Sequence, residues 1–110
     1  MIPTIDLAPG LTVSRIGFGG MALTPVYGGM PEADAERTLN EVIDAGITFV
    51  DTADVYGDNE DLVGRVLATR RDDVQLATKF GINAPVGSQP APGEKAVRGD
   101  RDYVRSACES

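Results

Sequence analysis

Three side chains able to donate, hold or stabilise a proton lie in or just after two apolar runs of the chain. Asp51 follows the run 47–50, Tyr56 lies in the polar segment that comes next, and Lys79 belongs to the run 74–80. A free tyrosine hydroxyl has a pKa of about 10, so it donates its proton efficiently near neutral pH only where its phenolate is stabilised. We expect the charge of Lys79 to lower the pKa of Tyr56, and Asp51 to hold Lys79 in place and charged. This trio suits protonation of an oxygen that is gaining negative charge.

The same polar residues allow simpler interpretations. Asp51 could be a capping aspartate, Tyr56 a half-buried tyrosine and Lys79 a solvated lysine, since perturbed groups also occur for structural reasons. Four aspartates could also be interpreted as a cluster for a hard metal ion: Asp51, Asp54, Asp58 and Asp61. Their spacing does not match the EF-hand loop, so we expect no metal site.

The elements that would bring the trio together are parallel strands. Residues 47–50 form a β-branched and aromatic run, and residues 18–23 and 74–80 are also predicted as strands. In parallel α/β folds, reactive groups collect at the carboxyl edge of the sheet. Asp51, Tyr56 and Lys79 should therefore emerge at one edge, next to Gly20 and Met21 at the end of the first strand.

The remaining pattern supplies a hairpin and three helices. Residues 2–7 and 11–16 alternate loosely, and Pro9-Gly10 between them suits the centre of a type II turn. A helix beginning at Pro31 should end at Gly46, and a second should be capped by Asn59. Residues 81–99 look like a long loop. Asp100 could cap a last helix whose apolar side comprises Val104, Ala107 and Cys108.

This order alternates strands and helices at the spacing of right-handed βα units, which predicts a parallel sheet. The two architectures built from such units are the eight-fold barrel and the open doubly wound sheet. Gly17, Gly19 and Ala22 fit a dinucleotide-binding fingerprint, but Pro25 and the following glycines interrupt the helix that must come next. Chance is the better explanation of that match.

Composition limits the class of protein. The 110 residues allow one domain, and the formal charge of −7 disfavours nucleic acid and anionic membrane surfaces as partners. The single cysteine, Cys108, cannot form a bridge within the chain, and the uncharged stretch 16–31 is too short and too broken to span a membrane. We therefore expect a cytoplasmic protein.

Four segments make the chain resemble the N-terminal part of the aldo-keto reductase family. They are residues 11–21, residues 44–57, Asn59-Glu60 with Gly64, and residues 76–81. The resemblance implies a (β/α)8 TIM barrel with a hairpin across its base, in which NADPH delivers hydride to an aldehyde or ketone. On this basis residues 1–110 would hold the hairpin and about the first three βα units of the barrel domain.

The resemblance also implies roles for individual residues. Tyr56 would be the proton donor, Lys79 the group that lowers its pKa, and Asp51 the partner of Lys79. Gly20, Met21 and Asp51 would lie at the nicotinamide end of the cofactor. NADPH is the expected cofactor, with NADH as the open alternative, and the partner is a small carbonyl substrate.

The chain also departs from the family pattern. The family has a catalytic histidine at the end of its fourth strand, whereas this chain contains no histidine and no fifth to eighth strand. Hydride transfer needs its donor fixed at about 3–3.5 Å from the carbonyl carbon. We therefore expect a truncated fragment that is weak or inactive as the isolated chain. The alternative is a non-catalytic remnant or interaction module, with an open barrel edge available for self-association.

Overall fold

The computed structural model describes residues 1–84 and 88–110, so part of the expected loop 81–99 lies outside the described residues. The strands are β1 (Thr4–Ala8), β2 (Leu11–Ser14), β3 (Phe18–Gly19), β4 (Phe49–Asp51) and β5 (Gln75–Ala77). The α-helices are α1 (Glu32–Asp44), α2 (Asn59–Leu67) and α3 (Arg101–Glu109). Short 3-10 helices are η1 (Gly20–Leu23), η2 (Pro25–Tyr27) and η3 (Arg71–Asp73).

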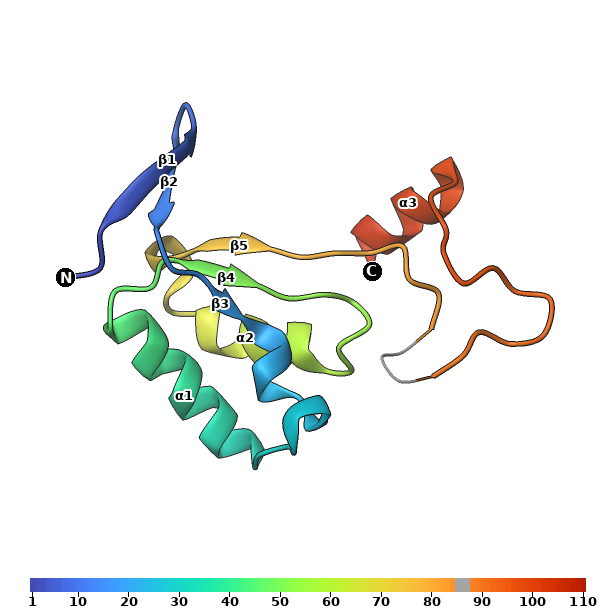
Figure 1. Ribbon diagram of the computed structural model, residues 1–110, viewed down its shortest axis with the longest axis horizontal. Coiled ribbons are helices and arrows are strands. Elements are labelled where there is room, and N and C mark those ends of the chain that lie inside the picture. The colour runs from blue at the N-terminus through green and yellow to red at the C-terminus, as the bar shows by residue number, and fades with distance from the viewer. Residues whose placement is uncertain (85–87) are drawn as a thin grey trace.

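Strands β1 and β2 form the expected antiparallel hairpin, with Thr4 opposite Ser14. Gly10 has φ +78°, which fits the third position of a type II turn and which other residues rarely adopt. Every residue of β1 is exposed, and the hairpin projects away from the other three strands (Figure 1). The backbone of Ser14 is joined to the start of the sheet, because its amide donates to Thr48 Oγ1 at 2.8 Å.

The remaining strands form a parallel sheet in the order β3-β4-β5. The register pairs Gly19 with Asp51, and Asp51 with Ala77. Helices α1 and α2 cover one face of this sheet (Figure 1). The core between them and the sheet contains Leu23, Ala35, Leu39, Ile43, Val50, Leu62, Val63, Val66, Leu67 and Val74, with Phe18 packed against it. The predicted parallel α/β arrangement is confirmed, and in the described part of the chain the sheet does not close into a barrel.

The bounds of all five expected strands were wrong. The hairpin strands predicted over 2–7 and 11–16 are Thr4–Ala8 and Leu11–Ser14. The strand predicted over 18–23 ends at Gly19, because the chain turns into η1, and the carbonyl of Gly20 accepts a hydrogen bond from Asn59. The strand predicted over 74–80 ends at Ala77, and the one predicted over 47–50 is shifted to Phe49–Asp51. The strands β3, β4 and β5 pair with one another over only two or three residues. This pairing, rather than local β-propensity, determines where each strand ends.

Helix α3 is capped as expected, since the Asp100 side chain accepts from the Tyr103 amide at 3.2 Å. The expectation that Cys108 fills the apolar side was wrong, because Cys108 is exposed. Helix α3 lies beyond the end of β5, away from the layer of α1 and α2 (Figure 1). Cys108 therefore lies away from the apolar core between the sheet and these two helices, where it could have been buried. Among the described residues, none of the helices has the length and hydrophobicity needed to cross a membrane.

Candidate active site

The site lies where β4 and β5 end. Beyond the two strands, the Thr52 amide donates to the Ala77 carbonyl at 2.8 Å, and the Asp54 amide donates to the Lys79 carbonyl at 3.1 Å. The pairing of the two chains therefore continues into the loops that carry the functional side chains. This continued pairing fixes the backbone of Lys79 opposite the segment that follows Asp51.

The ammonium group of Lys79 has two anchors. Its Nζ donates to Asp51 Oδ2 and, at 2.9 Å, to the Thr52 carbonyl. Burial works against the charged amine, but hydrogen bonding and charge from Asp51, with smaller contributions from Tyr56, outweigh it and raise the pKa of Lys79 above its usual value. Lys79 is therefore a cation at neutral pH, held at a defined place although both side chains are partly exposed.

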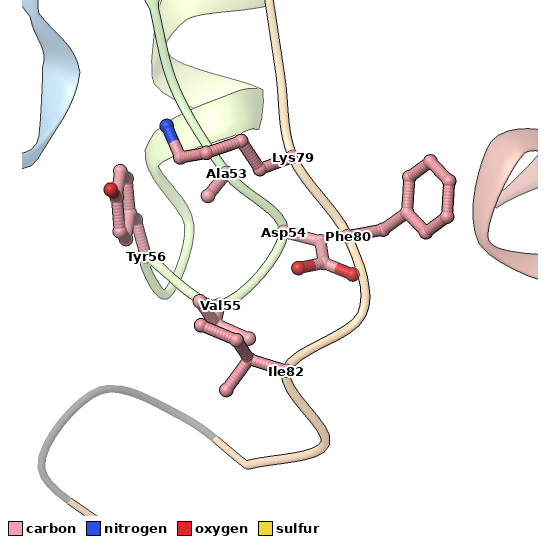
Figure 2. A pocket seen from close by; sticks show the side chains of 7 residues that line it. All are labelled: Ala53, Asp54, Val55, Tyr56, Lys79, Phe80 and Ile82. Carbon is pink, nitrogen blue, oxygen red and sulfur yellow. The ribbon is translucent and has the colours of Figure 1, made fainter. Parts of the chain in front are cut away.

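Tyr56 lies in the turn after β4. Its amide donates to the Ala53 carbonyl, and its carbonyl accepts from the Asn59 amide, each at 3.2 Å. Lys79 Nζ lies 5.2 Å from the centre of the Tyr56 ring, within the range of a cation–π interaction of about 6 Å. Figure 2 shows both side chains on the same side of the loops. The structure thus brings Asp51, Lys79 and Tyr56 together.

Gly20 and Met21 begin η1 beside the same strand ends. Gly20 is buried, and a Cβ atom there would lie 2.6 Å from Asn59 Oδ1 and 2.9 Å from the Asp51 carbonyl oxygen. Gly20 therefore lets the turn approach Asp51, and both Met21 and Asp51 are partly exposed. The Gly20 carbonyl already accepts from Asn59, so Gly20 shapes the turn rather than offering a free polar atom.

The role expected for Asn59 was wrong. Asp58 occupies the cap position of α2, and the Asn59 side chain is buried instead. Thr52 Oγ1 donates to Asn59 Oδ1 at 2.6 Å, and Asn59 Nδ2 donates to the Gly20 carbonyl at 3.0 Å. These bonds tie the turn after β3 to the segment after β4. One feature of the sequence could have indicated this arrangement. Asp58, directly before Asn59, is also a residue type that commonly caps a helix.

A cavity of about 220 Å³ lies beside this cluster (Figure 2). It is lined by Ala53, Asp54, Val55, Tyr56, Lys79, Phe80 and Ile82. Asp54 Oδ1 is buried and has no hydrogen-bond partner among the described residues. In the sequence, Asp54 stood out only as one of the four aspartates considered as a metal cluster. An unpaired buried carboxylate oxygen costs free energy. Because Asp54 lines the cavity, this oxygen is a polar group of the candidate site that has no partner within the described protein.

The arrangement suits proton donation to a small polar group in the cavity. A fixed ammonium stabilises negative charge that develops on a nearby oxygen. Val55, Phe80 and Ile82 contribute apolar side chains to the lining of the cavity, and Phe80 and Ile82 are also exposed to solvent.

Comparison with known proteins places this geometry in context. A model of the aldo/keto reductase family matches residues 15–110. The Glycine max protein named "Probable aldo-keto reductase 1" is 45% identical over 105 residues, covering 92% of this chain and 29% of that protein.

Solved structures agree. The holo form of an aldo-keto reductase from Bacillus halodurans superposes with a TM-score of 0.77 at 34% identity, covering 99% of this chain and 35% of that one. A protein from Pseudomonas aeruginosa superposes with a TM-score of 0.76 over 96% of this chain and 40% of its own length, and at 24% identity it supports the fold alone. This chain therefore spans less than half of each of these relatives.

Proposed function

The chain belongs to the aldo/keto reductase family, and we propose that Asp51, Tyr56 and Lys79 form the proton-donating part of an NADPH-dependent carbonyl reductase site. One observation carries this proposal: Lys79 Nζ contacts Asp51 Oδ2 and lies 5.2 Å from the centre of the Tyr56 ring. A cation this close to the phenol ring supports the proposal that Lys79 stabilises a phenolate there. The substrate would be an aldehyde or ketone small enough to place its oxygen near Tyr56.

In the proposed reaction, the reduced nicotinamide, when bound, supplies the hydride to the carbonyl carbon. Tyr56 gives its hydroxyl proton to the carbonyl oxygen, and the electron pair of the broken O–H bond stays on the phenolate. Lys79 stabilises that negative charge, while Asp51 keeps the ammonium in position. The product is an alcohol, and the phenol is restored by a proton from solvent.

The cofactor would meet this chain at its nicotinamide end. Gly20, Met21 and Asp51 would hold it there, because the register of Gly19 with Asp51 places η1 beside the strand end. Family membership supports a reduced nicotinamide cofactor, and we propose NADPH, with NADH as the alternative. The cytoplasm is the location we propose, on the basis of the single cysteine, Cys108.

We further propose that the three βα units are the first units of a (β/α)8 barrel. The parallel order β3-β4-β5, the helices on one face and the separate hairpin all support this. In a barrel the functional side chains lie at the carboxyl ends of the strands, as Asp51 and Lys79 do here.

The test joins this chain to the remaining strands of the Bacillus halodurans relative, in place of the segment that it matches. We expect the hybrid to oxidise NADPH when an aldehyde is added, and the isolated chain to do so weakly or not at all. Tyr56→Phe should lower kcat by about 10²- to 10⁴-fold. Thr12→Val, which removes a hydroxyl from the hairpin, is the control and should leave kcat unchanged. An unchanged kcat in Tyr56→Phe would overturn the proposed role.

A non-catalytic interaction module is the second candidate function. Apolar side chains near the β5 edge favour it, since Leu76 is 39% exposed, Phe80 42% and Ile82 56%. Sedimentation equilibrium separates the two functions. A stable self-associated chain, together with a hybrid that turns over no carbonyl substrate, would favour the module.

A further inference from the structure

Both backbone polar atoms of Gly81, two positions after Lys79, are held by residues far along the chain. The Gly81 amide donates to Tyr103 Oη at 3.2 Å, and the Gly81 carbonyl accepts from the Arg98 amide at 2.8 Å. Gly81 is buried and has φ +114°, a conformation that other residues rarely adopt. A Cβ atom there would also lie 3.1 Å from the Arg98 carbonyl oxygen. Contacts with residues distant in the sequence, rather than local backbone preference, therefore fix the position of Gly81.

The ring of Tyr103 is itself held in place. The Arg98 guanidinium lies 4.7 Å from its centre, and the Phe80 ring lies 6.4 Å away at a tilt of 55°. Asp100 pairs with Arg98 through both carboxylate oxygens, at 3.0 and 3.1 Å, and also accepts from the Tyr103 amide. Arg98, Asp100 and Tyr103 thus form one connected group at the start of α3.

This group acts on the segment that carries Lys79. Phe80 turns away from Lys79 and Tyr56 toward α3, so the two sides of the segment 79–81 face different partners (Figure 2). The Lys79 side chain reaches Asp51, whereas Phe80 and Gly81 are anchored to Tyr103. Without the Tyr103 hydroxyl, the segment would keep its pairing with Asp54 and the bridge of Ile82 to Val97. It would also keep the bond from the Arg98 amide to the Gly81 carbonyl, but the Gly81 amide would lose its partner.

We propose that Tyr103 is a positioning residue for Lys79, in that its hydroxyl holds Gly81 and thereby keeps the ammonium between Asp51 and Tyr56. The group at the start of α3 is in this way part of the site, although it lies on the far side of a long loop. This positioning of Lys79 does not depend on which reaction the site performs.

The test uses the 110-residue chain with ¹³C-labelled lysine and follows the Cε resonances of Lys79 and Lys95 as the pH is raised. Tyr103→Phe keeps the ring contacts and removes only the hydroxyl. We expect the pKa of Lys79 to fall toward its usual value while that of Lys95 stays unchanged. The Gly81 amide should exchange with solvent about five to ten times faster, as the loss of one hydrogen bond predicts. Ser106→Ala, which removes an exposed hydroxyl from the same helix, should change neither quantity.

Faster Gly81 exchange with an unchanged pKa of Lys79 would overturn the positioning role, because the anchor would then be purely structural. Two unchanged quantities would overturn it as well. If Tyr103→Phe did not fold, the rate of hydrogen exchange at the Gly81 amide would be measured in the unsubstituted chain instead. Protection comparable to that of the β5 amides supports the anchor, and exchange at the rate of an unfolded peptide contradicts it.

Discussion

Lys79 Nζ donates to the carbonyl oxygen of Thr52 at 2.9 Å, so the ammonium is bound to the backbone directly after Asp51 as well as to the Asp51 side chain. The same Thr52 donates through its hydroxyl to Asn59, which in turn reaches Gly20. One residue thus links the cation of the proposed site to the turn expected to meet the cofactor.

Removing the Asp51 charge should lower the pKa of Lys79. In Asp51→Asn the unfavourable effect of burial remains while the main opposing contribution is lost. A Cε titration of labelled lysine measures this. Glu60→Gln is the matched control, because Glu60 accepts from Thr78 rather than from Lys79. A pKa of Lys79 that is the same in both variants would show that Asp51 does not hold the ammonium.

The raised pKa of Lys79 also fixes a pH dependence of stability. Its contribution to folding is fully present below the usual lysine pKa of about 10.4 and is lost as the pH rises through the higher folded value. Urea unfolding at a series of alkaline pH values measures this loss. Lys79→Met should flatten that part of the profile, and a slope that persists unchanged would assign it to other groups.

The buried bonds of Asn59 should matter for stability. Asn59→Ala leaves Thr52 Oγ1 and the Gly20 carbonyl without their partner, which should lower the free energy of unfolding by about 1–3 kcal/mol. Urea denaturation measures the change. Asn83→Ala removes an exposed amide bonded to the Lys95 carbonyl and should cost no more than about 0.5 kcal/mol. Equal losses in the two variants would contradict the structural role of Asn59.

The start of α3 should respond to acid. The hydrogen bond from Arg98, with smaller help from the Tyr103 amide, holds the pKa of Asp100 below its usual value. The stabilisation is therefore present above the usual pKa and is lost as the pH falls through the lower folded value. Amide exchange at Tyr103 between pH 5 and about pH 2 reports the loss. Asp100→Asn still caps the helix but cannot titrate, so its Tyr103 exchange should lack this acid-dependent step.

Much of the fold followed from local pattern. Pro9-Gly10 predicted the hairpin turn, and Asp100 predicted the cap of α3. Local pattern failed where a distant partner decides the outcome. Asn59 has the chemistry of a helix cap, yet Thr52 and Gly20 bind its side chain.

Some features of the candidate site also follow from the sequence pattern, whereas others depend on distant contacts. The proximity of Asp51 and Lys79 follows from the rule that parallel strands end at one edge, and the structure places them in contact. Two features depend on loop geometry instead: the unpaired Asp54 oxygen and the reach of Tyr103 to Gly81. No periodicity in the sequence encodes either of them.

The proposed site requires that the Lys79 ammonium lie next to the Tyr56 phenol ring. The most direct measurement is the nuclear Overhauser effect between the Tyr56 ring protons and the Lys79 Cε protons in the folded 110-residue chain. This proximity predicts cross-peaks between the two sets of protons, and the loss of these cross-peaks in Asp51→Asn as Lys79 is released. Their absence from a chain in which the β4–β5 contacts are intact would contradict it.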